Sequence, residues 1–205
     1  MGLISDGTAI FDEGAMASGF VSSMVFIKKL TASSSGTLTF VNGSSGVVLD
    51  STYKEYMFIF KDLHPATNGV ELEFQGTIAD PSSSYNQTIT STLFKAGHGE
   101  DGSGDSFNYE ADADQQQGDG FQDIARYVGN GNDESVCGKL SLYDPSSTAH
   151  VKHFMANTQM YHASDEAENC FTAGYFNTTA GLTRFQFKFS SGNIDAGTIT
   201  LYGIK

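Results

Sequence analysis

The stretch RFQFKFSSGNIDAGTITLYG, residues 184–203, decides the fold class. From position 185 to 189, phenylalanine alternates with polar residues, so one face of this segment is apolar and the other is wet. Residues 190–193 then tolerate turn dihedrals, and residues 198–203 resume as a β-branched and aromatic run. The stretch predicts a closing β-hairpin that sits inside a sheet, because a terminal strand is held only by pairing with a strand already in place.

Similar segments recur along the chain, separated by turn signals such as Asn42-Gly43. Residues 53–62 are apolar on both faces, which predicts a central strand. Because amphipathic sheets must hide their apolar faces against each other, we expect an all-β, antiparallel β-sandwich of about ten strands. A jelly-roll-like arrangement is favoured, with an immunoglobulin-like sandwich as the alternative. The expected strands are residues 24–31, 37–41, 53–62, 70–75, 87–96, 121–128, 138–143, 151–161, 169–177, 185–189 and 198–203.

The composition predicts one β-domain at residues 24–205, preceded by an N-terminal docking arm at residues 1–23. Phenylalanine occurs 16 times and tryptophan is absent, so phenylalanine supplies most of the core. The arm has too many glycines for a helix and too many bulky apolar residues for a plain linker. We expect it to order on a partner surface, the alternative being a first edge strand with a frayed lead. Its expected docking residues are Leu3, Ile4, Ile10, Phe11, Met16 and Phe20.

The charge balance excludes several classes of partner. A net charge of −13, with no basic cluster, opposes binding to nucleic acid and to anionic lipid. The chain has no apolar run long enough for a spanning helix and no signal-like start, so we expect a soluble protein made in the cytoplasm, with no nucleic-acid or membrane partner. Cys137 and Cys170 are expected to be free thiols, since two cysteines in a domain with a sizeable core do not indicate a disulfide scaffold.

Two segments have weak metal-site patterns. His150 and His153 would share one face of a helix, but on the expected strand they point to opposite faces, which favours ordinary histidines over a zinc site. Residues 97–120 form an acidic, glycine-rich stretch that we expect to be a long, solvated, outward-facing loop. Asp112, Asp114 and Gln116 resemble the start of a calcium loop, but no glutamate closes it. We therefore predict no metal ion or cofactor.

Catalytic motifs are missing from the sequence, and the aromatic residues point to a different possibility. We find no nucleophile elbow and no phosphate-cradling loop, so no catalytic residue is predicted. A carbohydrate-binding module would need exposed aromatic residues on one sheet face, whereas tyrosines that cover core edges are the commoner case. The candidate glycan contacts are Tyr127, Tyr143, Tyr161 and Tyr175.

Four segments carry a resemblance to a known group of proteins: STYKEYMFIFKDLHPATNG (51–69), GNGNDESVCGKLSLYDPSSTAHVKHF (129–154), AGYFNTT (173–179) and FSSGNIDAGTITLYGIK (189–205). They resemble structural proteins of tailed phages, especially those of marine cyanobacterial hosts, and the likeness covers nearly the whole chain. The resemblance implies a virion component without known catalysis, and it transfers no catalytic signature. Cys137 and Cys170 depart from it, because they stand where such proteins have small or apolar residues.

These observations together predict a non-enzymatic virion surface protein, assembled in the host cytoplasm. We expect a head-decoration (cement) subunit or a tail-appendage (fibre) subunit that docks on other virion proteins and forms a homo-oligomer, with a trimer favoured. A glycan-binding receptor-recognition module of a tail fibre, which would contact a host surface glycan, is the alternative. A hydrolase domain is the third class.

Overall fold

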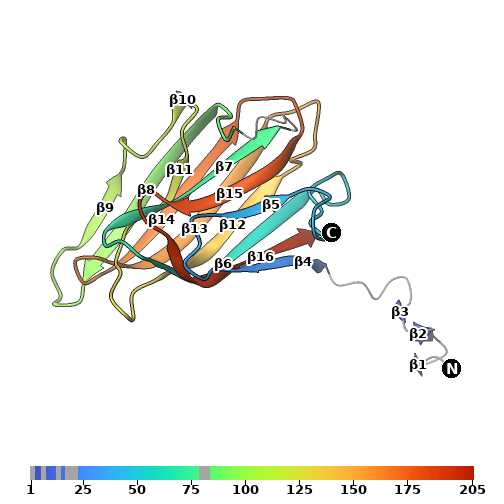
Figure 1. The fold of residues 1–205 in the computed structure, drawn as a ribbon, viewed down its shortest axis with the longest axis horizontal. Coiled ribbons are helices and arrows are strands. Elements are labelled where there is room, and N and C mark those ends of the chain that lie inside the picture. Colours follow the sequence, from blue (N-terminus) through green and yellow to red (C-terminus); the bar gives the residue numbers. More distant parts are fainter. Residues whose placement is uncertain (1–2, 6–7, 13–14, 17–22, 79–83) are drawn as a thin grey trace.

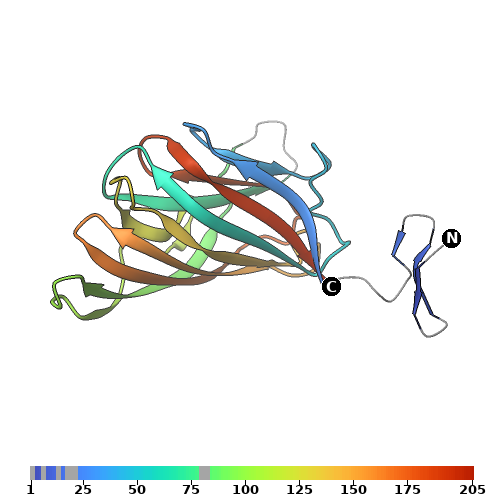
Figure 2. The ribbon, with the colours of Figure 1, turned by 90° about the horizontal axis from the view of Figure 1, so that it is seen from below.

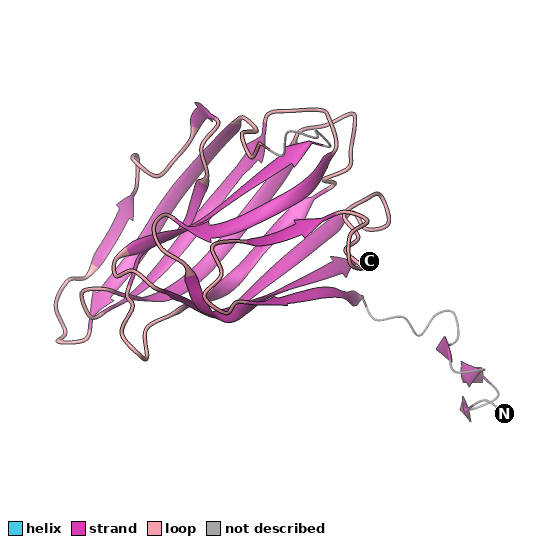
Figure 3. Cartoon of the chain, in the orientation of Figure 1, coloured by secondary structure: helices cyan, strands magenta, loops and turns pink. Residues whose placement is uncertain are grey.

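The computed structural model describes residues 3–5, 8–12, 15–16, 23–78 and 84–205. Every regular element in these ranges is a β-strand, as Figures 1 and 3 show, so the all-β prediction is confirmed for the described chain. Within the same ranges we find no helix of a length and apolarity suited to crossing a membrane.

The main sheet contains 13 strands, and all of its pairings are antiparallel. They are β4 (Met24–Thr31), β5 (Leu38–Val41), β6 (Glu55–Pro65), β7 (Val70–Ile78), β8 (Ile89–Gly99), β9 (Ser106–Tyr109), β10 (Gln116–Gly118), β11 (Gln122–Val128), β12 (Val136–Tyr143), β13 (Lys152–His162), β14 (Glu166–Phe176), β15 (Leu182–Phe189) and β16 (Ile194–Ile204).

The sheet curls into a nearly closed, barrel-like shape. Its main path runs β4-β16-β6-β12-β13-β11-β7-β15-β5, while β14 and β8 branch from β13 and carry β9 and β10. The end strands β4 and β5 approach each other across a shallow groove of about 170 Å³. At its rim the Lys28 ammonium donates a hydrogen bond to the Ser45 carbonyl at 3.0 Å. The sheet is therefore open between β4 and β5.

Two walls of this sheet face each other. We call β4, β16, β6, β12, β13, β14 and β8 the wide wall, and β11, β7, β15 and β5 the narrow wall. The two walls are joined where the end of β11 meets the end of β13, through the pair Val128 with His162 and the flanking backbone hydrogen bonds from Gly129 to Tyr161 and from Ala163 to Tyr127. The predicted sandwich and its jelly-roll-like form are not confirmed, because one continuous sheet supplies both walls.

Phenylalanine fills the space between the walls, as the composition predicts. Phe58 on the wide wall packs against Phe40 and Phe187 of the narrow wall, with ring centroids 5.2 and 5.1 Å apart. Phe74 meets Phe154 in the same way, at 4.9 Å. All five rings are fully buried, so aromatic packing between the walls holds the curled sheet together.

The predicted hairpin at residues 184–203 is wrong in its pairing. The two segments are strands β15 and β16, and β16 does lie inside the sheet, between β4 and β6. However, β15 pairs with β7 and β5 on the other wall, so residues 190–193 carry the chain across the core. Alternation of apolar and polar residues fixes which face of a strand is buried but not which strand lies beside it.

Other strand predictions have mixed outcomes. β6 is central, between β16 and β12, and the expected strand at residues 121–128 is present as β11, both as predicted. The expected partnership across the turn at residues 67–69 does not occur, because β6 and β7 belong to different walls. The expected loop at residues 97–120 is also wrong in part, since β8 extends to Gly99 and β9 and β10 both pair with it.

Near the N-terminus lie three short strands, β1 (Leu3–Ser5), β2 (Thr8–Asp12) and β3 (Ala15–Met16). They form a three-stranded antiparallel sheet of their own, with the order β1-β2-β3. Five of the six expected docking residues lie in these strands, and Phe20 lies outside the described residues. The docking role of the arm stays a prediction.

Candidate binding surface

The outward side of the wide wall presents a row of aromatic and apolar side chains. β13, β14 and β8 run side by side in continuous register, so alternate residues of all three strands point to the same side. On this side, two cross-strand rows lie next to each other, each with one residue from β13, β14 and β8. The rows are His153–Tyr175–Thr90 and Met155–Ala173–Thr92. We call this side the outer aromatic face, made of Thr90, Thr92, Phe94, Phe107, Tyr109, Tyr143, His153, Met155, Phe171, Ala173 and Tyr175.

One half of the outer aromatic face is a stacked phenylalanine cluster. Phe171 of β14 pairs with Phe94 of β8, and their rings stack with centroids 5.1 Å apart and an angle of 12°. Phe107 of β9 packs beside them, with its centroid 5.5 Å from that of Phe94. Phe107 is 74% exposed and Met155, nearby, is 58% exposed. The cluster is thus an apolar patch in contact with solvent.

The other half is a shallow groove of about 430 Å³ near the start of β13. Tyr143 and Tyr175 both line it, together with His153, whose ring lies edge-on to the Tyr175 ring at a centroid distance of 5.9 Å. The β8 residues Thr90 and Thr92 also line the groove. The site therefore combines aromatic rings with hydroxyl groups.

Amide side chains support one rim of this groove. Gln117 of β10 donates a hydrogen bond to the Thr90 hydroxyl at 2.6 Å, and it accepts one from the Asn177 amide at 2.7 Å. β10 pairs with β8 through Gln116 and Thr90, which brings Gln117 to this position. The rim is polar and uncharged.

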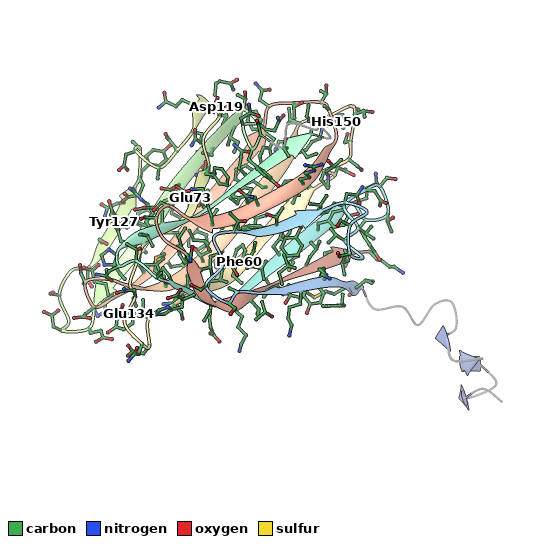
Figure 4. The ribbon with its side chains drawn as sticks, viewed as in Figure 1. Phe60, Glu73, Asp119, Tyr127, Glu134 and His150 are labelled. Carbon is green, nitrogen blue, oxygen red and sulfur yellow. The ribbon has the colours of Figure 1, made fainter. Side chains whose placement is uncertain are left out.

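The four tyrosines predicted as glycan contacts do not act as one set. The structure brings Tyr143 and Tyr175 together at the groove. Tyr161, at the far end of β13, has its hydroxyl 3.3 Å from the Asp165 carboxylate instead. Figure 4 shows Tyr127 at a different end of the molecule from His150, which precedes β13. Tyr127 and Tyr161 are therefore not part of the groove.

Two cationic side chains lie against the Tyr127 ring. The Lys95 ammonium lies 5.2 Å from the ring centroid and the Arg126 guanidinium 4.9 Å from it. Tyr127 has a backbone φ of 53°, a left-handed conformation that is unusual for an aromatic residue, at a register shift between β11 and β7. This backbone turn places the ring over the two cations.

Those cations belong to an ionic cluster in which Lys95, Arg126, Glu110 and Glu168 are largely buried and Asp112 is exposed. The Lys95 ammonium lies 2.8 Å from the Glu168 carboxylate. The Arg126 guanidinium contacts Glu110 at 2.7 Å and Asp112 at 2.8 Å. Burial alone would lower the pKa of Lys95, but its hydrogen bond with Glu168 raises it overall. The cluster ties the segment after β9 to β11, which explains why part of the acidic stretch is not solvated.

The environment of Asp123, beside this cluster, shifts the pKa of its carboxyl well above the ordinary value. Burial raises the pKa of its carboxyl to about 7, repulsion from Glu73 adds to the effect, and attraction by Arg126 opposes it. Its carboxylate lies 3.6 Å from the Arg126 guanidinium Nε, an ion pair too long for a hydrogen bond. The sequence gives no sign of this, because the shift depends on strands that are distant in the chain.

The weak metal-site patterns do not converge into a site. His153 packs on Tyr175 while His150 lies in the turn before β13. Asp112 binds Arg126, and Asp114 accepts a hydrogen bond from the Tyr109 hydroxyl at 2.5 Å. In the part of the chain that the structure describes, no group of three or more His, Cys, Asp or Glu side chains is arranged to hold a metal ion.

The two cysteines are free, as predicted. Cys137 pairs in register with Gln159 and accepts a hydrogen bond from the Asp62 amide at 3.2 Å. Cys170 is buried next to Thr158 in the β13–β14 register, and burial raises its pKa to about 12. Because Gln159 and Thr158 are successive residues of β13, the two thiols belong to opposite faces of the sheet.

The phenylalanine cluster was missed by sequence reasoning. Phe94 and Phe171 each stand in a strand whose opposite face also carries apolar residues, such as Leu93 and Phe176, so the sequence does not mark them as exposed. Only the register of β14 on β8 shows that they stack on the solvent side. The available signal was the presence of apolar residues on both faces of each strand.

Comparisons of the chain with protein-family models, with curated proteins and with solved structures gave no match.

Proposed function

We propose that the protein is a non-enzymatic structural protein of a phage virion surface, a head-decoration or tail-appendage subunit that acts by self-assembly and docking. The observation that carries this proposal is the exposed phenylalanine cluster on the outer aromatic face. A net charge of −13 opposes unspecific association of copies of the chain. An exposed, stacked apolar cluster on such a chain therefore indicates a specific surface that another chain covers. The resemblance of the quoted segments to tailed-phage structural proteins supports the virion setting.

The fold is consistent with this role. Two walls packed face to face through phenylalanine support a jelly-roll-like sandwich as the finer description. The edge strand β9 carries Phe107 and Tyr109, both exposed, which extends the cluster to the margin of the sheet. We infer a homo-oligomer, with a trimer favoured, in which this margin meets a neighbouring subunit. A glycan-binding role is the second candidate, and the groove beside the cluster favours it.

The test is the mass of the purified full-length chain in solution, measured by light scattering. We expect a trimer for the wild type and a monomer for the double variant Phe107→Ser with Phe171→Ser, because the two substitutions remove most of the exposed apolar cluster. Phe26→Ser is the matched control, since Phe26 is an exposed phenylalanine on the distant edge strand β4. A wild-type monomer, or a trimer that persists in the double variant, would contradict the proposal.

A further inference from the structure

We propose that the groove between Tyr143 and Tyr175 is a binding site for neutral carbohydrate. This inference rests on the second candidate function, glycan binding, and deepens it by naming the site and the neutral class of ligand. It depends on the lining of the groove, on its charge and on its unused hydrogen-bonding groups.

The shape of the groove suits sugar rings. Its volume of about 430 Å³ falls in the range of small-molecule sites. Tyr143 and Tyr175 supply ring faces and edges against which the C–H groups of a pyranose can pack, and Met155 and Ala173 continue the apolar floor. A second, smaller hollow of about 140 Å³ shares Thr92, Met155 and Ala173 with the groove. A ligand longer than one ring can therefore extend along the outer aromatic face.

The charge of the lining selects the class of ligand. The chain carries 24 acidic and 11 basic residues, yet none of them lines this groove. His153 and the tyrosines are its titratable groups. With no cation to offset the overall charge of −13, an anionic ligand is repelled and an uncharged one is favoured. The full lining is Thr90, Ser91, Thr92, Tyr143, His153, Phe154, Met155, Ala173, Gly174 and Tyr175.

Several polar groups in the groove are available to a ligand. Within the described chain, the hydroxyls of Tyr143 and Tyr175 and the ring nitrogens of His153 have no hydrogen-bond partner. Each hydroxyl both donates and accepts, which matches the hydroxyl groups of a sugar. The Thr90–Gln117–Asn177 chain of hydrogen bonds holds the polar rim in place, so these groups are arranged before a ligand arrives.

The same features disfavour a protein partner at this position. Protein interfaces are centred on apolar side chains that exclude water, which is the character of the phenylalanine cluster. The groove is a small concave area, and its mainly apolar lining also carries hydroxyl and imidazole groups that a purely apolar partner would leave unpaired. The two halves of the outer aromatic face thus suit different partners.

The experiment uses the full-length protein and saturation-transfer NMR, followed by calorimetric titration. The probes are neutral oligosaccharides of glucose, mannose, galactose and N-acetylglucosamine, with sialylated and sulfated oligosaccharides as the anionic arm. We expect at least one neutral oligosaccharide to bind, and Tyr175→Ala to weaken its affinity by about tenfold or more. Tyr175→Phe keeps the ring and should lose less.

Tyr161→Ala is the matched control, because Tyr161 is a half-buried tyrosine that lies outside the groove. The affinity of the Tyr161→Ala variant for the oligosaccharide should equal that of the wild type. If Tyr175→Ala lowers the melting temperature, His153→Ala serves as a second groove variant. Absence of binding to every neutral oligosaccharide, equal losses in the groove and control variants, or preference for anionic sugars would each overturn the proposal. The oligomeric state is measured on the same samples, so failure of sugar binding is distinguishable from failure of assembly.

Discussion

Phe187 on β15 and Phe58 on β6 meet with ring centroids 5.1 Å apart, although their strands belong to opposite walls and do not pair. Phe187 also contacts Phe40, Phe60 and Phe74, at centroid distances of 6.3, 5.4 and 6.0 Å. One side chain therefore connects four strands from both walls. Loss of this ring removes contacts that hydrogen bonding along the sheet cannot replace.

Phe187→Ala should destabilise the fold by about 3–5 kcal/mol, since a buried ring leaves both a transfer loss and a cavity. Gln186→Ala on the same strand should cost about 1 kcal/mol or less, because Gln186 faces outward and loses one hydrogen bond to the Thr39 hydroxyl, 3.1 Å away. Denaturant unfolding of both variants measures the difference. Equal losses would mean that the burial of β15 is misassigned.

The raised pKa of Asp123 predicts a specific dependence of stability on pH. In the unfolded chain this carboxyl has a pKa near the ordinary 3.8, and in the folded protein it is about 7. Between about pH 4 and pH 7 the folded state therefore holds a proton that the unfolded state has released. The contribution of Asp123 to the free energy of unfolding is fully present below about pH 4 and is lost as the pH rises through 7.

Asp123→Asn cannot ionise, so it should be more stable than the wild type by roughly 2–4 kcal/mol at about pH 8. At about pH 4 the two proteins should differ little, because Asp123 is then protonated in the folded state. Denaturant unfolding of both proteins across this range gives the difference, in which the titration of the other carboxylates cancels. A difference that does not change with pH would count against the buried, protonated Asp123.

The N-terminal arm offers a test of docking. The 13-stranded sheet begins at Met24, so deleting residues 1–20 should leave a soluble domain with a nearly unchanged melting temperature. On the proposed virion role, the same deletion should abolish incorporation into the phage particle, because burial of a residue such as Phe11 against a partner contributes about 1.5–3 kcal/mol. Incorporation at normal occupancy would rule out the arm as the anchor. Unfolding of the truncated chain would show that the segment belongs to the core.

The sequence predicts local features of this fold well. The alternation at residues 185–189 correctly identifies the buried face of β15, and the two apolar faces of residues 53–62 correctly indicate a central strand. Both follow from side-chain period, which is a property of neighbouring residues. The predicted core of phenylalanine is confirmed for the same reason, since composition limits what can fill the interior.

Long-range relationships were not predictable in this way. The sequence places β15 next to β16, yet the chain crosses the core between them, and short turn residues serve both kinds of connection. Tyr143 and Tyr175 become neighbours only through the pairing of β12, β13 and β14. The candidate site depends on register between distant strands, so listing tyrosines gave two residues that share the groove and two that lie elsewhere.

The pairing of β4 with β16 has a consequence for synthesis on the ribosome. These strands lie side by side in Figures 1 and 2, and Met24 is opposite Ile204, so the first strand of the main sheet is held by the last. During translation β4 and one edge of β6 remain unpaired until β16 has emerged. Exposed strand edges on nascent chains are sites of mispairing between neighbouring copies. Slow release of β16, as by a translational pause shortly before it, should therefore increase aggregation of the newly made chain.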